Sequence, residues 1–242
     1  MARIDVSFVG TESFYNDTSY SYSYIDRMES VCDSVWSDIP DGSGDYSINF
    51  SQYSSSQIEI PEDELCTVCV EDTDNDGELE ACSGKGYCKF RGRLNQADSW
   101  LYGNEYAMYK SHDVIVIADY HPQGDGGLRG AAQSEAGGST DKCCMLDLKE
   151  INNEVYDSNS PWRNIGYGGI AAHELVHMFL DGHEHENASV GSTGTIIYDP
   201  DADYWCNGGS PDSDMEIIED VSSCTKTDVR NWIDNNGGRL TY

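Results

Sequence analysis

The chain has 242 residues and a formal net charge of −30, from 44 aspartates and glutamates against 14 lysines and arginines. A surface this acidic argues against nucleic acid and anionic membranes as partners. Five tryptophans, sixteen tyrosines and several apolar runs argue against disorder, so a packed core is expected.

The acidic residues are spread along the chain rather than gathered in one tail. This pattern predicts a halophilic protein that folds in concentrated salt, where screening offsets the repulsion among carboxylates. Nine cysteines favour disulfides and a secreted, extracellular protein. Residues 1–10 are too few and too polar for a signal peptide. We therefore expect that a leader has been removed, or that the protein leaves the cell another way, for example as part of a virus particle or after lysis. Its expected location is extracellular, or on a virion or cell surface.

The first predicted elements are strands and one helix. Residues 3–10 alternate apolar and polar side chains, which predicts a strand. Residues 22–40 place apolar side chains at helical spacing, and a proline closes the segment. Two further strand patterns follow, at 45–53 and 56–62.

Residues 61–93 form a cysteine-rich, acidic insertion. Its four cysteines are Cys66, Cys69, Cys82 and Cys88. A structural zinc site is an alternative, but the last pair lacks Cys-x-x-Cys spacing, so two disulfides are favoured. Asp72, Asp74 and Asp76 precede a glycine, as in the first half of a calcium loop, which predicts Ca²⁺. Ser83 stands where such a loop has its bidentate glutamate, so a solvated acidic turn is the alternative.

The second half continues the mixed pattern. Residues 97–113 predict a helix, and the apolar run at 114–120 predicts a strand that is buried on both faces. Another strand is expected at 141–149, before an apolar helix that contains the motif HELVH. The whole indicates one domain with a mixed sheet and a few helices.

The motif HELVH predicts a catalytic zinc site. His173 and His177 lie one helical turn apart on one face, where both imidazoles can bind one Zn²⁺. Glu174 is the expected catalytic base, because its carboxylate can take a proton from the attacking water and pass it to the leaving amine. His183 is the expected third ligand, and His185 is its nearest competitor.

The segment HELVHMFLDGH, residues 173–183, resembles the metzincin signature His-Glu-x-x-His-x-x-Gly-x-x-His. The resemblance covers roughly residues 97–235 and is closest in pattern to the adamalysin branch. It implies an α+β zincin fold, in which a mixed, twisted sheet has an antiparallel edge strand beside an active-site helix. The implied activity is that of a zinc-dependent endopeptidase.

One departure from the signature is plain, because Leu180 replaces the glycine that ends the family's helix. The turn must then use other backbone geometry, shifted to Asp181 and Gly182. The resemblance divides the chain into an N-terminal subdomain, 1–182, and a C-terminal subdomain, 183–242.

The resemblance also implies roles for residues outside the helix. Met215 would be the methionine of the Met-turn, and Cys206 and Cys224 flank it and could be bridged. Residues 221–233 would form the closing helix, and Ile217 replaces a tyrosine that some members use in the transition state. The expected edge strand would bind a protein or peptide substrate as an added strand. Its residues are Leu128, Arg129, Gly130 and Ala131.

Two alternatives remain open at this stage. A gluzincin-type protease would take its third ligand from Glu216, although His183 and Met215 argue against it. A surface- or virion-associated protein could instead keep the protease fold for binding or structure. Glu174 argues for the enzyme, because a purely structural zinc site needs no base beside its ligand.

Overall fold

The computed structural model describes most of the first half of the chain and selected elements of the second half. The described residues are 2–17, 21–37, 39, 46–52, 58–71, 80–120, 130–133, 136–149, 151, 166–180, 187–190, 193–194, 205–206, 216–217, 221, 223–237 and 240. Within them, no helix is both long and apolar enough to cross a membrane.

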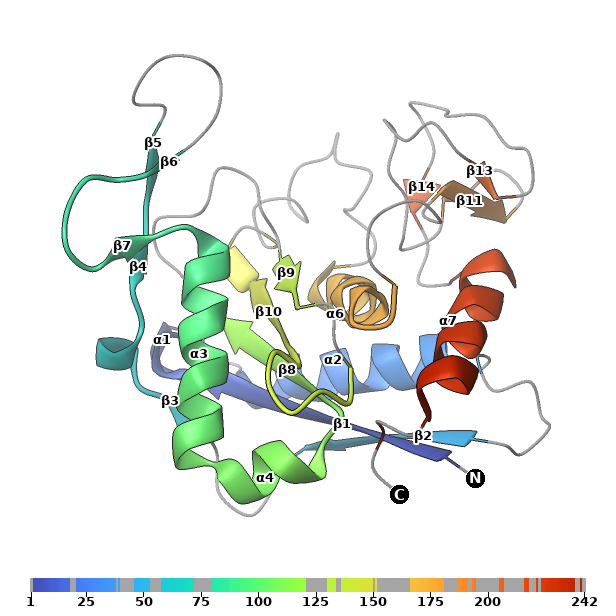
Figure 1. Cartoon of the computed structure of the whole chain (residues 1–242). Coiled ribbons are helices and arrows are strands. Elements are labelled where there is room, and N and C mark those ends of the chain that lie inside the picture. The colour runs from blue at the N-terminus through green and yellow to red at the C-terminus, as the bar shows by residue number, and fades with distance from the viewer. Residues whose placement is uncertain are drawn as a thin grey trace.

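A mixed sheet forms the centre of the molecule (Figure 1). Its strands are β1 (Ala2–Thr11), β2 (Tyr46–Gln52), β3 (Glu59–Ile60), β8 (Val114–Asp119), β9 (Gly130–Ala132) and β10 (Cys143–Asp147). The order is β2-β1-β8-β10-β9, with β3 paired to the end of β1. All these pairs are parallel except β9 with β10, so the antiparallel edge strand is confirmed.

The central strands are buried on both faces, as the apolar run at 114–120 predicted. Val114, Val116 and Ala118 of β8 join one hydrophobic cluster, whereas Ile115 and Ile117 join a second cluster on the opposite face. This division follows from the two-residue period of a strand. Because both faces need apolar side chains, the strand has no polar side until Asp119.

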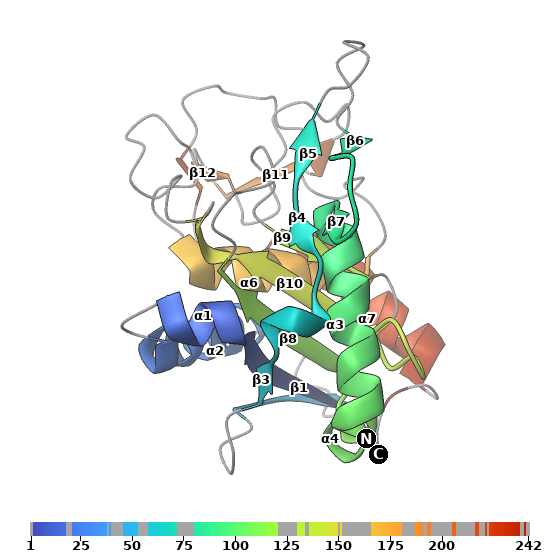
Figure 2. The ribbon, with the colours of Figure 1, turned by 90° about the vertical axis from the view of Figure 1, so that its left-hand side faces the viewer.

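Helices cover each face of this sheet. One cluster contains buried residues of α2 (Ser21–Trp36), α6 (Gly166–His177) and α7 (Ser223–Asn236). The other contains buried residues of α3 (Phe90–Asn104) and α4 (Tyr106–Ser111). The short helix α1 (Glu12–Asp17) follows β1 directly. In Figure 2, turned by 90°, α3 crosses the sheet on the side away from α2.

The helix expected at 97–113 begins earlier and is divided in two. Phe90, Leu94, Ala97 and Leu101 are all buried, and their spacing of three or four residues places them on one side of α3. The helix therefore starts inside the segment that was predicted as part of the cysteine-rich insertion. The break falls at Glu105, whose backbone leaves helical geometry.

The cysteine-rich insertion is closed by two disulfides, Cys66–Cys88 and Cys69–Cys82, which confirms disulfides over structural zinc. After the 3-10 turn η1 (Glu62–Glu64), four short strands pair in two ladders. They are β4 (Thr67–Val68), β5 (Val70–Glu71), β6 (Glu80–Ala81) and β7 (Tyr87–Cys88). This segment projects from the body beside the top of α3 (Figure 1).

A buried ion cluster attaches the base of that segment to the sheet. The Arg93 side chain is 0 % exposed, and all five of its N–H groups donate hydrogen bonds. The acceptors are both oxygens of Asp119, both oxygens of Glu62 and the carbonyl of Cys66. Asp119 also accepts from the hydroxyls of Thr11 and Ser13. Every N–H group of the Arg93 side chain therefore has an acceptor, and both carboxylate oxygens of Asp119 accept hydrogen bonds.

The described C-terminal elements are four short strands and a helix. The strands are β11 (Asn187–Val190), β12 (Thr193–Gly194), β13 (Trp205–Cys206) and β14 (Glu216–Ile217), in the order β13-β11-β12-β14. Helix α7 extends over Ser223–Asn236, where the closing helix was expected. The subdomain boundary at 182/183 stays a prediction.

Candidate metal centre

The helix that carries the histidine motif is held closely against its neighbours. Ala172, Leu175 and Val176 of α6 are buried in the core that α6 shares with α2. At Gly168 the two helices approach so closely that a Cβ would lie 2.6 Å from Cγ2 of Val31. Helix α6 is therefore a rigid scaffold for the residues on its other side.

His173 and His177 converge as their spacing predicted. Their Nε2 atoms lie 3.0 Å apart, and the ring centroids are separated by 4.6 Å. Both side chains are partly exposed, so the pair borders solvent. Two imidazoles that bind one tetrahedral zinc at about 2.0–2.1 Å hold their nitrogens about 3.3 Å apart. The observed separation fits that arrangement closely, and it also fits a hydrogen bond between the two rings.

Glu174 is buried, with 6 % of its surface exposed, and it points toward the edge strand. A Cβ built on Gly130 of β9 would lie only 2.5 Å from Oε1 of Glu174 and 2.7 Å from its Cδ. A side chain at this position would therefore require the Glu174 carboxylate to move. The expected base and the expected substrate-binding strand are thus in direct contact.

The departure at Leu180 has a structural explanation. The amide of Leu180 donates to the carbonyl of Val176 at 2.9 Å, so helical hydrogen bonding continues past His177. Leu180 is not among the described residues with positive φ, and its side chain packs against the core. Helix α6 itself ends at His177, and residues 178–180 form a turn and a bend. Two residues, Asp181 and Gly182, separate Leu180 from His183, and all three of Asp181, Gly182 and His183 lie outside the described part of the chain.

The turn after α6 is fixed on two sides. The amide of Ala136, in the loop between β9 and β10, donates to the carbonyl of Met178 at 3.0 Å. The ring of Phe179 lies 5.0 Å from that of Trp36 and 5.1 Å from that of Trp232 in α7. The closing helix thus packs directly onto the end of the histidine helix.

Several predicted site residues lie outside the described part of the chain. These are His183, His185, Met215, Leu128, Arg129, Asp72, Asp74, Asp76 and the side chains of Cys206 and Glu216. Among the described residues, no group of three or more His, Cys, Asp or Glu side chains is placed to hold a metal ion. Cys224 is disulfide-bonded.

Two contacts of Glu174 were not predicted from the sequence. One is Gly130, described above. The other is the thiol of Cys144 in β10, whose pKa is raised well above its ordinary value by burial first and by the negative charge of Glu174 second. Neither pairing has a sequence signal, because only the packing of α6 on β9 and β10 brings these residues together.

Comparison with known proteins supports the fold alone. No protein-family model matches this chain, and no curated protein sequence does. Metalloproteinase-II from Bacteroides fragilis is a structural neighbour with a TM-score of 0.50 and 9 % sequence identity over 96 % of this chain. A chaperone–substrate complex also matches, with a TM-score of 0.49 and 9 % identity over the whole chain. This chain spans 53 % and 35 %, respectively, of those two proteins. The mixed sheet and its helices are therefore compatible with a metalloprotease-like fold.

Proposed function

We propose that the protein is a zinc-dependent endopeptidase. The observation that carries the proposal is the 3.0 Å separation of the two Nε2 atoms of His173 and His177, with Glu174 buried beside them. The likeness in fold to a metalloproteinase and the resemblance of residues 173–183 to the metzincin signature support it. The proposed zinc ligands are His173, His177 and His183.

The donor set fits a catalytic zinc site. Neutral imidazoles are preferred zinc ligands, and three protein ligands leave the open position that catalysis requires. A zinc ion held there would supply Lewis acidity, which lowers the pKa of a water molecule toward about 7 and polarises a carbonyl group. A structural site would have four protein ligands and no need for a carboxylate beside them.

Glu174 would act as the general base and then as the general acid. Its carboxylate accepts a proton from the attacking water and then gives it to the departing amine nitrogen of the scissile bond. Contact with Gly130 fixes the position of the carboxylate relative to β9. Because β9 is the last strand in the sheet order, an extended peptide could pair with its outer edge and lie across the carboxylate. Pairing through the backbone would give affinity without a particular substrate sequence.

A matched pair of glutamate variants tests the proposal. We expect Glu174→Gln to retain zinc but to lower kcat on an unfolded protein substrate in high salt by at least about 100-fold, because general acid–base catalysis contributes that much or more. Glu64→Gln, at an exposed position of η1, should match the wild type. A chelator should abolish wild-type activity, and added Zn²⁺ should restore it.

The same experiment separates the enzyme from a binding protein that keeps the fold. Zinc bound by wild type and by Glu174→Gln, with no cleavage by either, would contradict the protease proposal and favour a binding role. A metal analysis that finds no zinc in the wild type would contradict both.

A further inference from the structure

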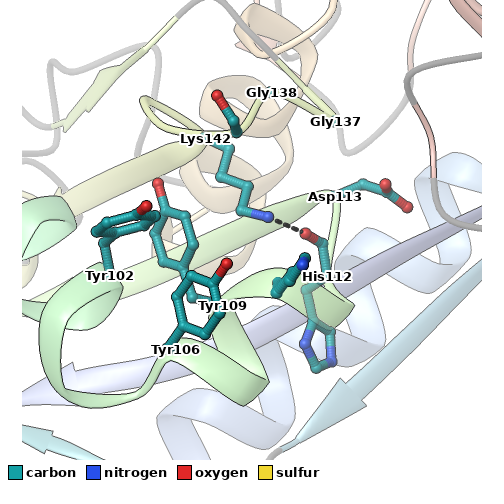
Figure 3. Close-up of a pocket in the computed structure, with 10 residues that line it drawn as sticks. Tyr102, Tyr106, Tyr109, His112, Asp113, Gly137, Gly138 and Lys142 are labelled. Atoms are coloured by element: carbon teal, nitrogen blue, oxygen red, sulfur yellow. Dashed lines mark hydrogen bonds between the residues drawn. The ribbon is translucent and has the colours of Figure 1, made fainter.

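A pocket of about 270 Å³ lies next to α4 and the loops that lead into β8 and β10 (Figure 3). None of the residues that line it belongs to α6 or β9. It is therefore a different site from the histidine pair. Its walls combine tyrosines with lysines, which is an unusual composition for the surface of a chain with so few basic residues.

The aromatic wall is exposed, although tyrosine rings are normally covered. Tyr102 is 42 % exposed and Tyr106 is 48 % exposed. They are two of the three large hydrophobic side chains that are exposed among the described residues, and the third, Tyr87, lies on the disulfide-linked segment. Their rings meet edge to face, with centroids 5.4 Å apart, and Tyr102 contacts the buried Tyr109 in the same way at 5.5 Å. This rigid cluster offers a ring surface on which a flat ligand can stack.

The cationic wall consists of Lys142, which is held in place by buried contacts, and Lys110. Lys142 is only 4 % exposed, and its ammonium donates to the carbonyl of His112 at 2.6 Å while it lies 4.5 Å from the centre of the Tyr109 ring. Lys110 lies 5.5 Å from the centre of the Tyr106 ring. Burial lowers the pKa of Lys142, and the charge of Asp113 partly offsets this effect. An anion in the pocket would replace part of the hydration that the ammonium has lost.

These contacts decide the sign of the ligand's charge. A tyrosine cluster can bind a cation through its ring faces. Here, however, the protein's own ammonium groups already lie over Tyr106 and Tyr109. A cationic ligand would be repelled by Lys110 and Lys142, whereas an anionic group would complement both. The lining also includes Asp113, whose carboxylate accepts a hydrogen bond from the amide of Asp5 at 2.8 Å.

We propose that this pocket binds a small ligand in which a carboxylate is attached to a six-membered ring that packs on tyrosine. The carboxylate would be bound by Lys142 and Lys110. The ring would stack on one of Tyr102 and Tyr106 and meet the other edge to face, because those two rings are nearly perpendicular. Both aromatic acids and uronic acid sugars carry this combination of groups. The site does not depend on the proposed zinc chemistry, so the two proposals can fail separately.

Calorimetric titration with three sodium salts tests the proposal. Benzoate and glucuronate each carry a ring and a carboxylate, whereas acetate has only the carboxylate. We expect at least one of the two ring acids to bind at least about tenfold more tightly than acetate. The tighter of the two shows whether the ligand is an aromatic acid or a uronic acid sugar. Chelation of zinc should leave this binding unchanged.

Variants locate the binding in the pocket. Lys142→Met should raise the Kd of the tighter ring acid at least about tenfold, because it removes the buried charge. Tyr106→Ser should raise it at least about threefold, through lost stacking, at an exposed position where folding is not at risk. The matched controls are Lys85→Met and Tyr87→Ser, both exposed and both outside the pocket.

The outcomes are decisive in either direction. Binding that is no tighter for the ring acids than for acetate would overturn the proposal. So would equal losses in Tyr106→Ser and Tyr87→Ser. If Lys142→Met does not fold, Lys110→Met takes its place, and an unchanged Kd in that variant together with Tyr106→Ser would also overturn the assignment.

Discussion

The two faces of the central sheet each carry a cluster of polar side chains, but the nitrogen atoms of the two clusters are used in opposite ways. On the α3 side, Arg93 uses all five N–H groups on partners within the chain, so the cluster has no donor left for a ligand. On the α6 side, His173 and His177 direct the same ring nitrogen at each other on the border of solvent. The first arrangement stabilises, and the second is suited to sharing a cation. The buried charge of Arg93 and Asp119 therefore does not by itself identify a functional site, and the geometry of the nitrogen atoms decides.

Removal of one imidazole should have the largest effect. We expect His177→Ala to lose zinc and to lower peptidase activity by at least about 1,000-fold, because the metal contributes several kcal/mol to the reaction. The thermal unfolding of the apo protein should change little, since the side chain is partly exposed. Metal analysis, the peptidase assay and calorimetry check these three results. Normal zinc content in the variant would refute the ligand assignment.

Removal of the arginine should act on stability instead. Arg93→Met leaves the fully buried Asp119 without its counter-ion, so we expect the free energy of unfolding to fall by about 3–5 kcal/mol. Zinc content per folded molecule should stay normal. Urea denaturation measures the change, with Arg91→Met at an exposed position on the same helix as the control. Equal stability of the two variants would show that the cluster is dispensable.

A smaller effect is expected from the contact between the edge strand and the base. Gly130→Ala places a Cβ against the Glu174 carboxylate, so we expect kcat to fall by about 10- to 100-fold while zinc remains bound. Gly103→Ala is the matched control, because a Cβ there meets nothing within 4 Å. Kinetics and metal content of both variants provide the measurement. Full activity in Gly130→Ala would mean that Glu174 need not hold this position.

The smallest expected effect is the pH dependence of the free energy of unfolding that Asp119, on the α3 side of the sheet, produces. Burial alone would raise the pKa of Asp119, but hydrogen bonds and the charge of Arg93 lower it in the folded protein. The stability contributed by the ionised carboxylate is therefore fully present above its unfolded pKa of about 3.9 and is lost as the pH falls through the lower folded value. In Arg93→Met the folded pKa of Asp119 should instead lie above the unfolded value, so acid favours that fold. The stability difference between the variant and the wild type should thus narrow between pH 7 and pH 3, and a constant difference in urea titrations would contradict this explanation.

Local patterns predicted the elements that position the site. The apolar run at 114–120 predicted β8, and the polar and apolar alternation at 3–10 predicted β1. The separation of His173 and His177 predicted that their rings would meet, since helical geometry depends only on spacing. The edge strand came from the metzincin resemblance, and the structure confirms its antiparallel pairing with β10.

Contacts between distant segments were not predictable in the same way. Arg93 is 26 residues from Asp119 and 31 from Glu62, and no periodicity relates them. The contact between Gly130 and Glu174 likewise arises only when α6 packs beside β9. The start of α3 at Phe90 was missed because four cysteines in the preceding residues indicated a loop. In each case tertiary packing decided a question that the local sequence leaves open.

The cysteines whose side chains the structure describes are either disulfide-bonded or reduced, and this division gives the protein an internal reporter of unfolding. The projecting segment holds its sulfurs as disulfides, whereas Cys32, Cys143 and Cys144 are reduced and buried within the body. Burial raises the pKa of all three thiols, so the nucleophilic thiolate is scarce in the native state. Cys32 and Cys144 belong to the cluster under α6, and Cys143 belongs to the cluster under α3. An alkylating reagent followed by mass spectrometry would therefore record when each layer opens, one face at a time, without any label added to the chain.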